Sequence, residues 1–238
     1  MRDNQRDIEN NPENTQPVNN KAYVSGKVVG EPIFSHDVYG EGFYGFKLEV
    51  ERLSNAVDIL PITVSERLVD ISSIRQGRFM EIFGQIRSYN NYAPSEQRNK
   101  LLLTLFARDI SMDESPTVGR NPNEVFLNGY ICKPPTHRLT PFGREITDIL
   151  LAVNRSYNKS DYIPCIAWGR NSRFAGGLSV GDNVRMWGRM QSREYQKKLD
   201  DDNTETRVAY EVSASKIDTP KPDIQDQEPQ ENPFDEFI

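Results

Sequence analysis

The chain has 238 residues, 27% of them charged, and a formal net charge of −6. This length fits one large or two small domains, and the negative charge argues against a nucleic-acid partner unless it is concentrated in one segment. There is no apolar run of membrane-spanning length and no signal-peptide pattern at the start, so we expect a cytoplasmic protein. Cys132 and Cys165 lie outside any CxxC or Cys/His cluster, which predicts no disulfide framework, no metal site and no cofactor.

Three segments have the composition of disordered or linking chain. Residues 1–19 are polar and Asn-rich, residues 113–122 (DESPTVGRNP) consist of turn formers, and residues 218–238 are Pro-rich and acidic. They leave two segments of similar length, 20–112 and 123–217, as the expected domains.

The two segments repeat one another. KAYVSG at Lys21–Gly26 corresponds to EVFLNG at Glu124–Gly129, at an offset of 103 residues. The same or nearly the same offset relates Pro32 to Pro135, DILPI at 58–62 to DYIPC at 161–165, Gly77 to Gly181 and Gly84 to Gly188. A nearly constant offset carried by glycines, prolines and apolar alternation predicts a duplicated domain.

The second copy has the pattern of five strands. They are expected at Val125–Ile131, Ile146–Val153, Tyr162–Ala167, Asn183–Met190 and Arg207–Ser215, with a short helix within Gly169–Ser179. Five strands with a helix after the third is the order of an OB-fold barrel. We therefore predict an all-β protein of two tandem five-stranded OB-fold barrels, each with a short helix; another small β-barrel or sandwich is the alternative.

The acidity is concentrated in the tail. Residues 218–238 contain Lys221 against seven acidic residues, whereas 123–217 contain fourteen Lys/Arg against eleven Asp/Glu, and 20–112 contain eleven of each. The second copy alone is therefore mildly basic, as a phosphate-binding surface requires.

Aromatic and basic residues are interleaved in the second copy, the combination that single-stranded nucleic acid needs for base stacking and phosphate contact. In VRMWGRM, strand alternation places Val184, Met186 and Met190 in the core and the residues between them outside. The predicted nucleic-acid-binding residues are Arg155, Tyr157, Tyr162, Trp168, Arg170, Arg173, Arg185, Trp187, Arg189, Arg193, Tyr195, Lys197 and Lys198. Any single ring could instead be half-buried packing; Tyr162 and Trp168 could point inward, and Trp187 could lie in a subunit interface.

The first copy lacks this pattern at the matching positions. Ser54, Ile59 and Ser65 stand where the second copy has Tyr157, Tyr162 and Trp168, and Glu81 and Gln85 replace two arginines. We predict a weaker role in DNA binding for it, with assembly or partner contact as its main task.

The tail ends in NPFDEFI. Its last two apolar residues and the terminal carboxylate suit a small basic-rimmed pocket on a partner, with the acidic residues at the rim. The predicted partner-binding residues are Phe234, Asp235, Glu236, Phe237 and Ile238. The alternative is a tail that only increases solubility.

These segments resemble the bacterial single-stranded DNA-binding protein family, most clearly over 123–217. NEVFLNGYICKPP is similar to that family's opening strand, YIPCIAWGRNSRFA to its third strand, turn and helix, and VGDNVRMWGRMQSREY to its fourth strand and hairpin. The resemblance implies a non-enzymatic protein that coats single-stranded DNA in replication, recombination and repair and is associated with the nucleoid. It places base-stacking aromatics at Tyr157, Tyr162, Trp168 and Tyr195, and implies recruitment of replication and repair proteins by the tail. It also implies a homodimer with four barrels.

Two other functions remain open. Some OB-fold barrels are metal-dependent nucleases, but His36 and His137 lie outside any acidic cluster in the sequence. An accessory primosome-type or RNA-binding protein would use the same barrels to dock partners rather than to coat DNA.

Overall fold

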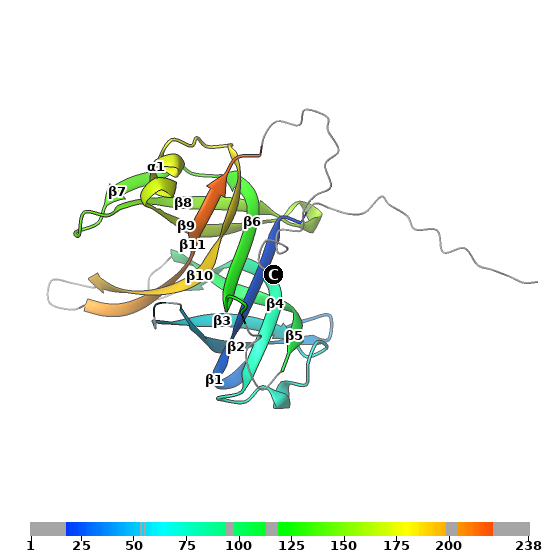
Figure 1. Ribbon diagram of the computed structural model, residues 1–238. Coiled ribbons are helices and arrows are strands. Elements are labelled where there is room, and N and C mark those ends of the chain that lie inside the picture. The colour runs from blue at the N-terminus through cyan, green and yellow to red at the C-terminus, as the bar shows by residue number, and fades with distance from the viewer. Residues whose placement is uncertain are drawn as a thin grey trace, which may run out of the picture.

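Two barrels lie one above the other in the computed structural model, which describes residues 18–52, 54, 56–93, 98–112, 119–198 and 204–220 (Figure 1). The first barrel contains β1 (Asn20–Val38), β2 (Glu41–Glu51), β3 (Val57–Ser65), β4 (Phe79–Ala93) and β5 (Arg98–Ser111). The second contains β6 (Asn123–Ile131), β7 (Thr136–Leu139), β8 (Glu145–Asn154), β9 (Ser160–Trp168), α1 (Gly169–Gly176), β10 (Asn183–Lys198) and β11 (Thr204–Asp218). In the described part of the chain, no helix has the length and apolarity needed to span a membrane.

Each barrel closes through the same strand order. In the first barrel β1 pairs with both β2 and β4, β4 pairs with β5, and β5 runs parallel to β3. In the second, β6 pairs with β8 and β10, β10 pairs with β11, and β11 runs parallel to β9. The prediction of two tandem five-stranded OB-fold barrels is confirmed. The additional strand β7 pairs with β8 in the second barrel, as the second half of the longer strand β1 pairs with β2 in the first.

The helices differ between the barrels. The predicted helix within Gly169–Ser179 is present as α1 but ends at Gly176. The matching segment of the first barrel forms only a three-residue 3-10 turn, Ile71–Ser73, and not the short helix expected there. The Asp70 carboxylate accepts hydrogen bonds from the backbone N–H and the hydroxyl of Ser72. These local bonds favour a tight turn over a longer helix.

The core follows the strand alternation. Val184, Met186 and Met190 are fully buried, as expected from VRMWGRM. Leu48 and Leu105 fill the first barrel in the same way. Apolar side chains at every second position therefore form the interior of each barrel and leave the alternate positions free for the outer face.

The two barrels are joined by strand pairing. β1 and β6 run antiparallel, with five residue pairs from Asn20↔Leu127 to Val24↔Asn123, and make one 11-stranded sheet of the two barrels. Matching asparagines stand at the two ends of this pairing. Asn20 bonds both backbone groups of Ile86 (2.8 and 2.9 Å), and Asn123 does the same to Met190 (2.7 and 2.9 Å). The junction is therefore close to two-fold symmetric.

A fully buried aspartate of each barrel bonds to the opposite barrel. Asp58 in β3 lies 3.1 Å from Arg189 Nη1, and its Oδ1 accepts a 2.8 Å hydrogen bond from the Ser192 N–H. Asp161 in β9 lies 3.0 Å from Arg87 Nη1, and its Oδ1 accepts a 2.7 Å hydrogen bond from the Ser88 N–H. We call these the Asp58 and Asp161 junction clusters.

A second arginine from the aspartate's own barrel completes each cluster. Arg52 Nε donates to Asp58 at 2.7 Å, and Arg155 Nη1 lies 3.5 Å from Asp161. Burial lowers the pKa of Arg189 and of Arg87, while the hydrogen bond to Asp58 raises the pKa of Arg52. Each buried carboxylate is thus balanced by two guanidinium groups, one from each barrel.

Replacing Gly84 or Gly188 by alanine should destabilise the protein. A Cβ at Gly84 would lie 2.1 Å from the Phe106 carbonyl oxygen, and one at Gly188 would lie 2.2 Å from that of Ser213. Such overpacking costs about 1–3 kcal/mol or more, because the contact is with backbone. Thermal unfolding followed by circular dichroism should show a lower midpoint for both variants. Gly45→Ala is the control, because its Cβ would meet only the Ile62 oxygen at 3.9 Å, and an equal loss in this variant would contradict the explanation.

Asp58→Asn and Asp161→Asn should each weaken the junction. Removing a buried charge leaves its arginines without an anion, which costs about 3–5 kcal/mol when all partners are buried. We expect about 2 kcal/mol or more here, because the arginines are partly exposed. Urea unfolding measures the change, with Asp148→Asn as the control, since the Arg138–Asp148 pair is exposed on both sides. A loss no greater than that of the control would show that the clusters contribute little stability.

Candidate nucleic-acid interface

Tyr162 and Trp168 point outward from the same strand. Ile163, Cys165 and Ala167 of β9 are buried in the barrel, whereas Tyr162 is 46% exposed and Trp168 38% exposed. Six residues of strand separate the two rings by about 20 Å along the barrel surface. Both rings are therefore open to solvent on what we call the outer face of the second barrel, the solvent-facing side of β8 to β11.

The outer face continues onto β10 and β11. Arg189 lies opposite Ser213, and Tyr195 lies opposite Arg207, in the antiparallel pairing of these strands. The Arg193 guanidinium lies 5.8 Å from the centre of the Tyr195 ring and 3.6 Å from Glu211. A cation beside an aromatic ring is thus present on β10, as the sequence pattern predicted.

Tyr157 stands on a strained turn between β8 and β9. Its φ is +61° and its ring is 94% exposed, and Asn158 follows with φ +54°. The Arg155 N–H donates to the Lys159 carbonyl oxygen at 2.7 Å and closes the turn. A bulky residue in the left-handed region costs roughly 1–2 kcal/mol, so this turn holds the ring in solvent at an energetic cost.

Five of the predicted phosphate-binding arginines have carboxylate partners within the chain. Arg173 pairs with Glu145 (2.9 Å), Arg185 with Asp218 (2.8 Å) and Arg193 with Glu211, and these three arginines are between 41% and 70% exposed. The partners of Arg173 and Arg185 are themselves partly exposed, and such pairs contribute about 0–1 kcal/mol, so a phosphate can replace these two carboxylates at little expense. Glu211, the partner of Arg193, is buried and holds its arginine more firmly. Arg155 and Arg189 differ, because their partners are the buried Asp161 and Asp58 of the junction clusters.

The remaining predicted residues have mixed surroundings. Arg170 is exposed and makes no ion pair with another described residue. Lys197 is half-buried near the end of β10. Lys198 ends the same strand, but its side chain, like the whole predicted tip from Phe234 to Ile238, lies outside the described residues.

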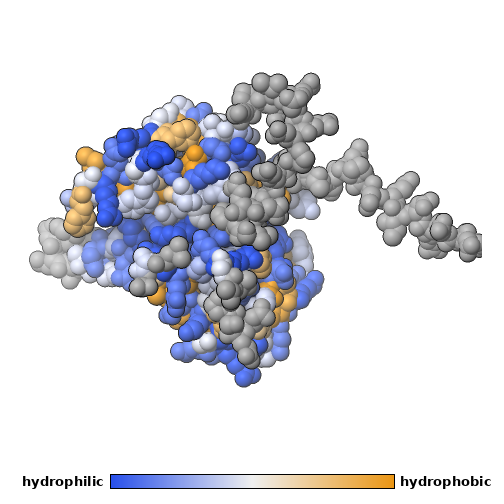
Figure 2. All heavy atoms as spheres, in the orientation of Figure 1, coloured by the Kyte–Doolittle hydropathy of each residue, from blue (hydrophilic) through white to orange (hydrophobic). Residues whose placement is uncertain are grey.

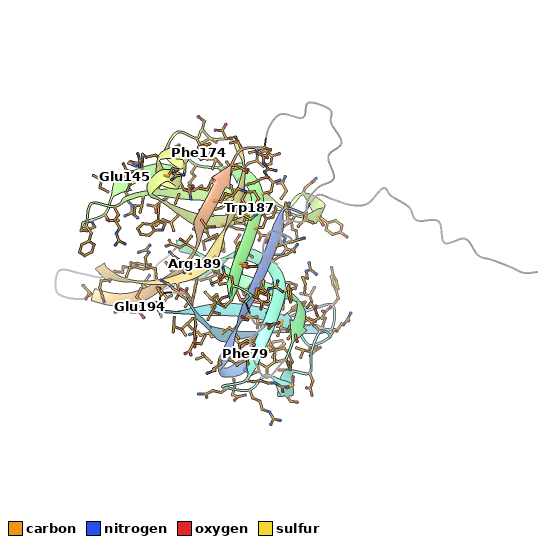
Figure 3. The ribbon with its side chains drawn as sticks, viewed as in Figure 1. Phe79, Glu145, Phe174, Trp187, Arg189 and Glu194 are labelled. Carbon is orange, nitrogen blue, oxygen red and sulfur yellow. The ribbon has the colours of Figure 1, made fainter. Side chains whose placement is uncertain are left out.

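Trp187 has different neighbours from the other predicted rings. It packs on Phe126 of β6 at a centroid distance of 5.1 Å, and Lys216 Nζ lies 4.4 Å from the centre of its ring. Its indole Nε1 is buried and has no acceptor among the described residues. Figure 3 shows Trp187 and Arg189 on the same strand, but these contacts assign Trp187 to the sheet that joins the barrels.

The β7–β8 hairpin carries candidate residues that the sequence reasoning missed. Phe142 at its tip is 91% exposed, and Arg138 pairs with Asp148 across the hairpin. The available signal was TPFGRE, in which a turn sequence holds an aromatic residue beside an arginine. Figure 2 shows apolar residues on the visible side as small separate patches among hydrophilic ones on both barrels.

The first barrel has an aromatic cluster on β1, β2 and β5. Phe43 of β2 stacks on His36 (5.0 Å between ring centres) and contacts Phe106 of β5, with Arg108 5.1 Å from the Phe106 ring. Phe43 itself is buried, so this cluster offers less open ring surface than β9 does. Glu81, which stands where the second barrel has Arg185, is also buried, and it accepts a hydrogen bond from the Tyr23 hydroxyl.

Neither cysteine is paired with the other. Cys132 and Cys165 are both free thiols, and burial raises the pKa of each. No three His, Cys, Asp or Glu side chains come together as a metal site within the described ranges.

Solved structures with a similar fold come from Thermus aquaticus. The wild-type single-stranded DNA binding protein of that organism matches with a TM-score of 0.66 at 19% identity, covering 86% of this chain and 94% of that one. A deletion variant of the same protein matches with a TM-score of 0.62 at 20% identity, over 88% and 98% of the two chains. At these identities the likeness concerns the fold, and it extends over both barrels.

Sequence relatives match part of the chain. Single-stranded DNA-binding protein A of Bacillus subtilis is 34% identical over 83 residues, which are 32% of this chain and 48% of the relative. The single-stranded DNA-binding protein of Halalkalibacterium halodurans is 32% identical over 104 residues, 40% of this chain and 58% of the relative. The chain thus spans about half the length of the curated relatives it matches.

The family profile covers the second barrel. Residues 122–219 match the Single-strand binding protein family. They run from the residue before β6 to the residue after β11 and so contain the whole outer face with Tyr162 and Trp168. The second barrel thus matches the single-strand binding protein family over its whole length.

Proposed function

We propose that the protein binds single-stranded DNA through the outer face of its second barrel and is not an enzyme. The observation that carries the proposal is the outward, solvent-open placement of Tyr162 and Trp168 on a barrel whose relatives are named single-stranded DNA-binding proteins. Tyr157 and Tyr195 extend the set of rings at either side. Ring faces stack with any base, so the binding is largely independent of sequence.

The arginines of the outer face bind phosphates by exchanging their carboxylate partners for them. Phosphates take the place of the carboxylates on Arg173 and Arg185 and release counterions, so affinity falls as salt rises. Arg155 and Arg189 keep their buried aspartates and contribute mainly by holding the two barrels together. This division refines the sequence-based set, which treated all five arginines alike.

The other parts of the chain serve this function indirectly. The first barrel acts mainly as a scaffold for the second. The tail presents Phe237 and Ile238 to replication and repair proteins, and two chains assemble into a dimer of four barrels. On this proposal the protein coats and protects single strands during replication, recombination and repair in the cytoplasm, in association with the nucleoid.

Trp168→Ala and Tyr162→Ala should weaken binding to oligo-dT. Each stacked ring contributes about 1–3 kcal/mol, which corresponds to a loss of roughly fivefold or more. Fluorescence anisotropy with labelled oligo-dT at several salt concentrations measures this loss of affinity. Phe174→Ala is the control, because Phe174 is a half-exposed ring on α1, outside the β8 to β11 face (Figure 3). Equal affinity of all three variants and the wild type would contradict the proposed interface.

The same titration separates the alternative functions. Weak binding to duplex DNA and to oligo-U, beside tight binding to oligo-dT, is the expected result for a protein that coats DNA. A preference for oligo-U would favour the RNA-binding alternative, and metal-dependent loss of the oligonucleotide would favour a nuclease.

Removing the tail after Pro220 should strengthen DNA binding at low salt. Residues 221–238 hold one lysine and six acidic residues, and such a segment competes with phosphates for the basic face. The cut spares β11, whose last residue Asp218 pairs with Arg185. Anisotropy titrations of both proteins at low and high salt test this, with the difference expected to vanish at high salt. Unchanged affinity at low salt would exclude competition by the tail.

A further inference from the structure

A polar pocket opens where the start of the first barrel meets the second. Its volume is about 600 Å³, and it lies beside the turn that carries Tyr157. The pocket is lined by Asn19, Asn128, Tyr130, Asn154, Arg155, Asn158, Lys159, Ser160 and Asn183. Five of these nine residues are asparagines, and two are cations. None but Arg155 belongs to the predicted DNA-binding set.

Several polar groups of this pocket have no partner. Asn183 Nδ2 donates to Asn128 Oδ1 (3.0 Å) and to the Gly129 carbonyl oxygen (2.9 Å). These bonds leave the oxygen of Asn183 and the NH₂ of Asn128 without a hydrogen-bond partner among the described residues. A donor and an acceptor therefore stand next to each other on adjacent strands, β6 and β10.

The same pocket offers a ring and two positive charges. Tyr130 is directly opposite Asn183 in the β6–β10 pairing, is 46% exposed and has no ring neighbour in the described structure. Lys159 makes no ion pair with any described residue, and Arg155 shares Asp161 with Arg87. Ring, amides and cations are the three kinds of group needed for one nucleotide: base face, base edge and phosphate.

The matching place in the first barrel shows that the fold does not need these residues. Its backbone contact is the same: the Ser25 N–H donates to the Pro122 carbonyl oxygen at 2.9 Å, as the Asn128 N–H donates to Asn19 at 2.8 Å. Yet Ser25 replaces Asn128, Lys27 replaces Tyr130 and Phe79 replaces Asn183. The first barrel thus forms the same contact between strands without the amides of Asn128 and Asn183. Folding therefore does not explain why the second barrel has these two amides.

We propose that this pocket is a base-reading subsite that takes one adenine nucleotide of the bound single strand. Tyr130 stacks on the base, the free amide groups of Asn128 and Asn183 bond its edge, and Lys159 faces the phosphate. Asparagine amides match the adjacent donor and acceptor of adenine, N6 and N7. The subsite rests on the proposed function, and it adds a composition preference to a surface that otherwise stacks every base.

The position beside Tyr157 makes the subsite reachable. Asn158 lines the pocket and directly follows Tyr157, whose exposed ring belongs to the stacking surface. A strand stacked on Tyr157 therefore passes the mouth of the pocket. The left-handed φ of both residues is the kind of local strain that occurs at ligand sites.

Two oligonucleotides of equal length test the proposal: oligo-dT, and oligo-dT in which every fifth thymidine is replaced by deoxyadenosine. Spacing the adenines prevents them from stacking on one another. The wild type should bind the adenine-containing strand at least about fivefold more tightly, the lower end of the discrimination of a bidentate amide–base pair. Asn128→Ser and Asn183→Ala should abolish that preference and leave the affinity for oligo-dT unchanged, because they remove only the amides that read the base edge. Asn128→Ser introduces the residue of the matching position in the first barrel, Ser25, so the fold is preserved.

Lys27→Ala is the matched control, because Lys27 holds the position of Tyr130 in the first barrel. It should keep the adenine preference. Equal binding of both strands by the wild type would overturn the subsite but not the proposed function. A parallel loss of affinity for both strands in the two pocket variants would also overturn it, by showing a general contact. Failure of the wild type to bind either strand would overturn the proposed function and the subsite with it.

Discussion

The pairing of β1 with β6, closed at each side by a buried aspartate, is the constraint on which the rest of the structure depends. Five residue pairs make the backbone connection, and the Asp58 and Asp161 clusters fix the angle at which the barrels meet. A buried carboxylate without cations is strongly unfavourable, so each barrel is complete only when the other supplies its arginine. The two barrels therefore form one structural unit rather than two independent domains joined by a linker.

This constraint decides which cations remain for the proposed DNA contacts. Arg189 and Arg87 donate to an aspartate of the opposite barrel and to a glutamine on their own strand. Their guanidinium groups are thus held in place before any ligand arrives. Arg173 and Arg185, by contrast, pair with partly exposed carboxylates and can change partner. The outer face accordingly combines a rigid junction with cations that exchange easily.

The fold could be predicted from short-range and repeating features, and the junction could not. Alternation in VRMWGRM placed Met186 and Met190 in the core, and the offset of Gly84 and Gly188 revealed the duplication. The repeat also matched Asp58 with Asp161, but nothing local says that each binds an arginine more than 70 residues away along the chain. The order of glutamine and arginine along the strand is also reversed between the copies. Gln85 corresponds to Arg189, and Arg87 corresponds to Gln191. Among the rings, the interleaving of aromatic and basic residues predicted Tyr162 and Trp168 as base-stacking residues but left their outward orientation open. The partners of Trp187 and the amide pocket arise only when strands from both barrels come together.

The near symmetry of the junction allows structural residues to be separated from functional ones within a single chain. Asn20 and Asn123, Asp58 and Asp161, and Ser88 and Ser192 make matching bonds in both copies, so their role is to hold the fold. Where the copies differ under the same backbone constraint, as at Lys27 and Tyr130 or at Ser65 and Trp168, folding does not dictate the residue. Most of the exposed rings and the free amides of the second barrel stand at such positions. The first barrel is thus an internal reference for the second, and the difference between them supports the surface proposed for the single strand.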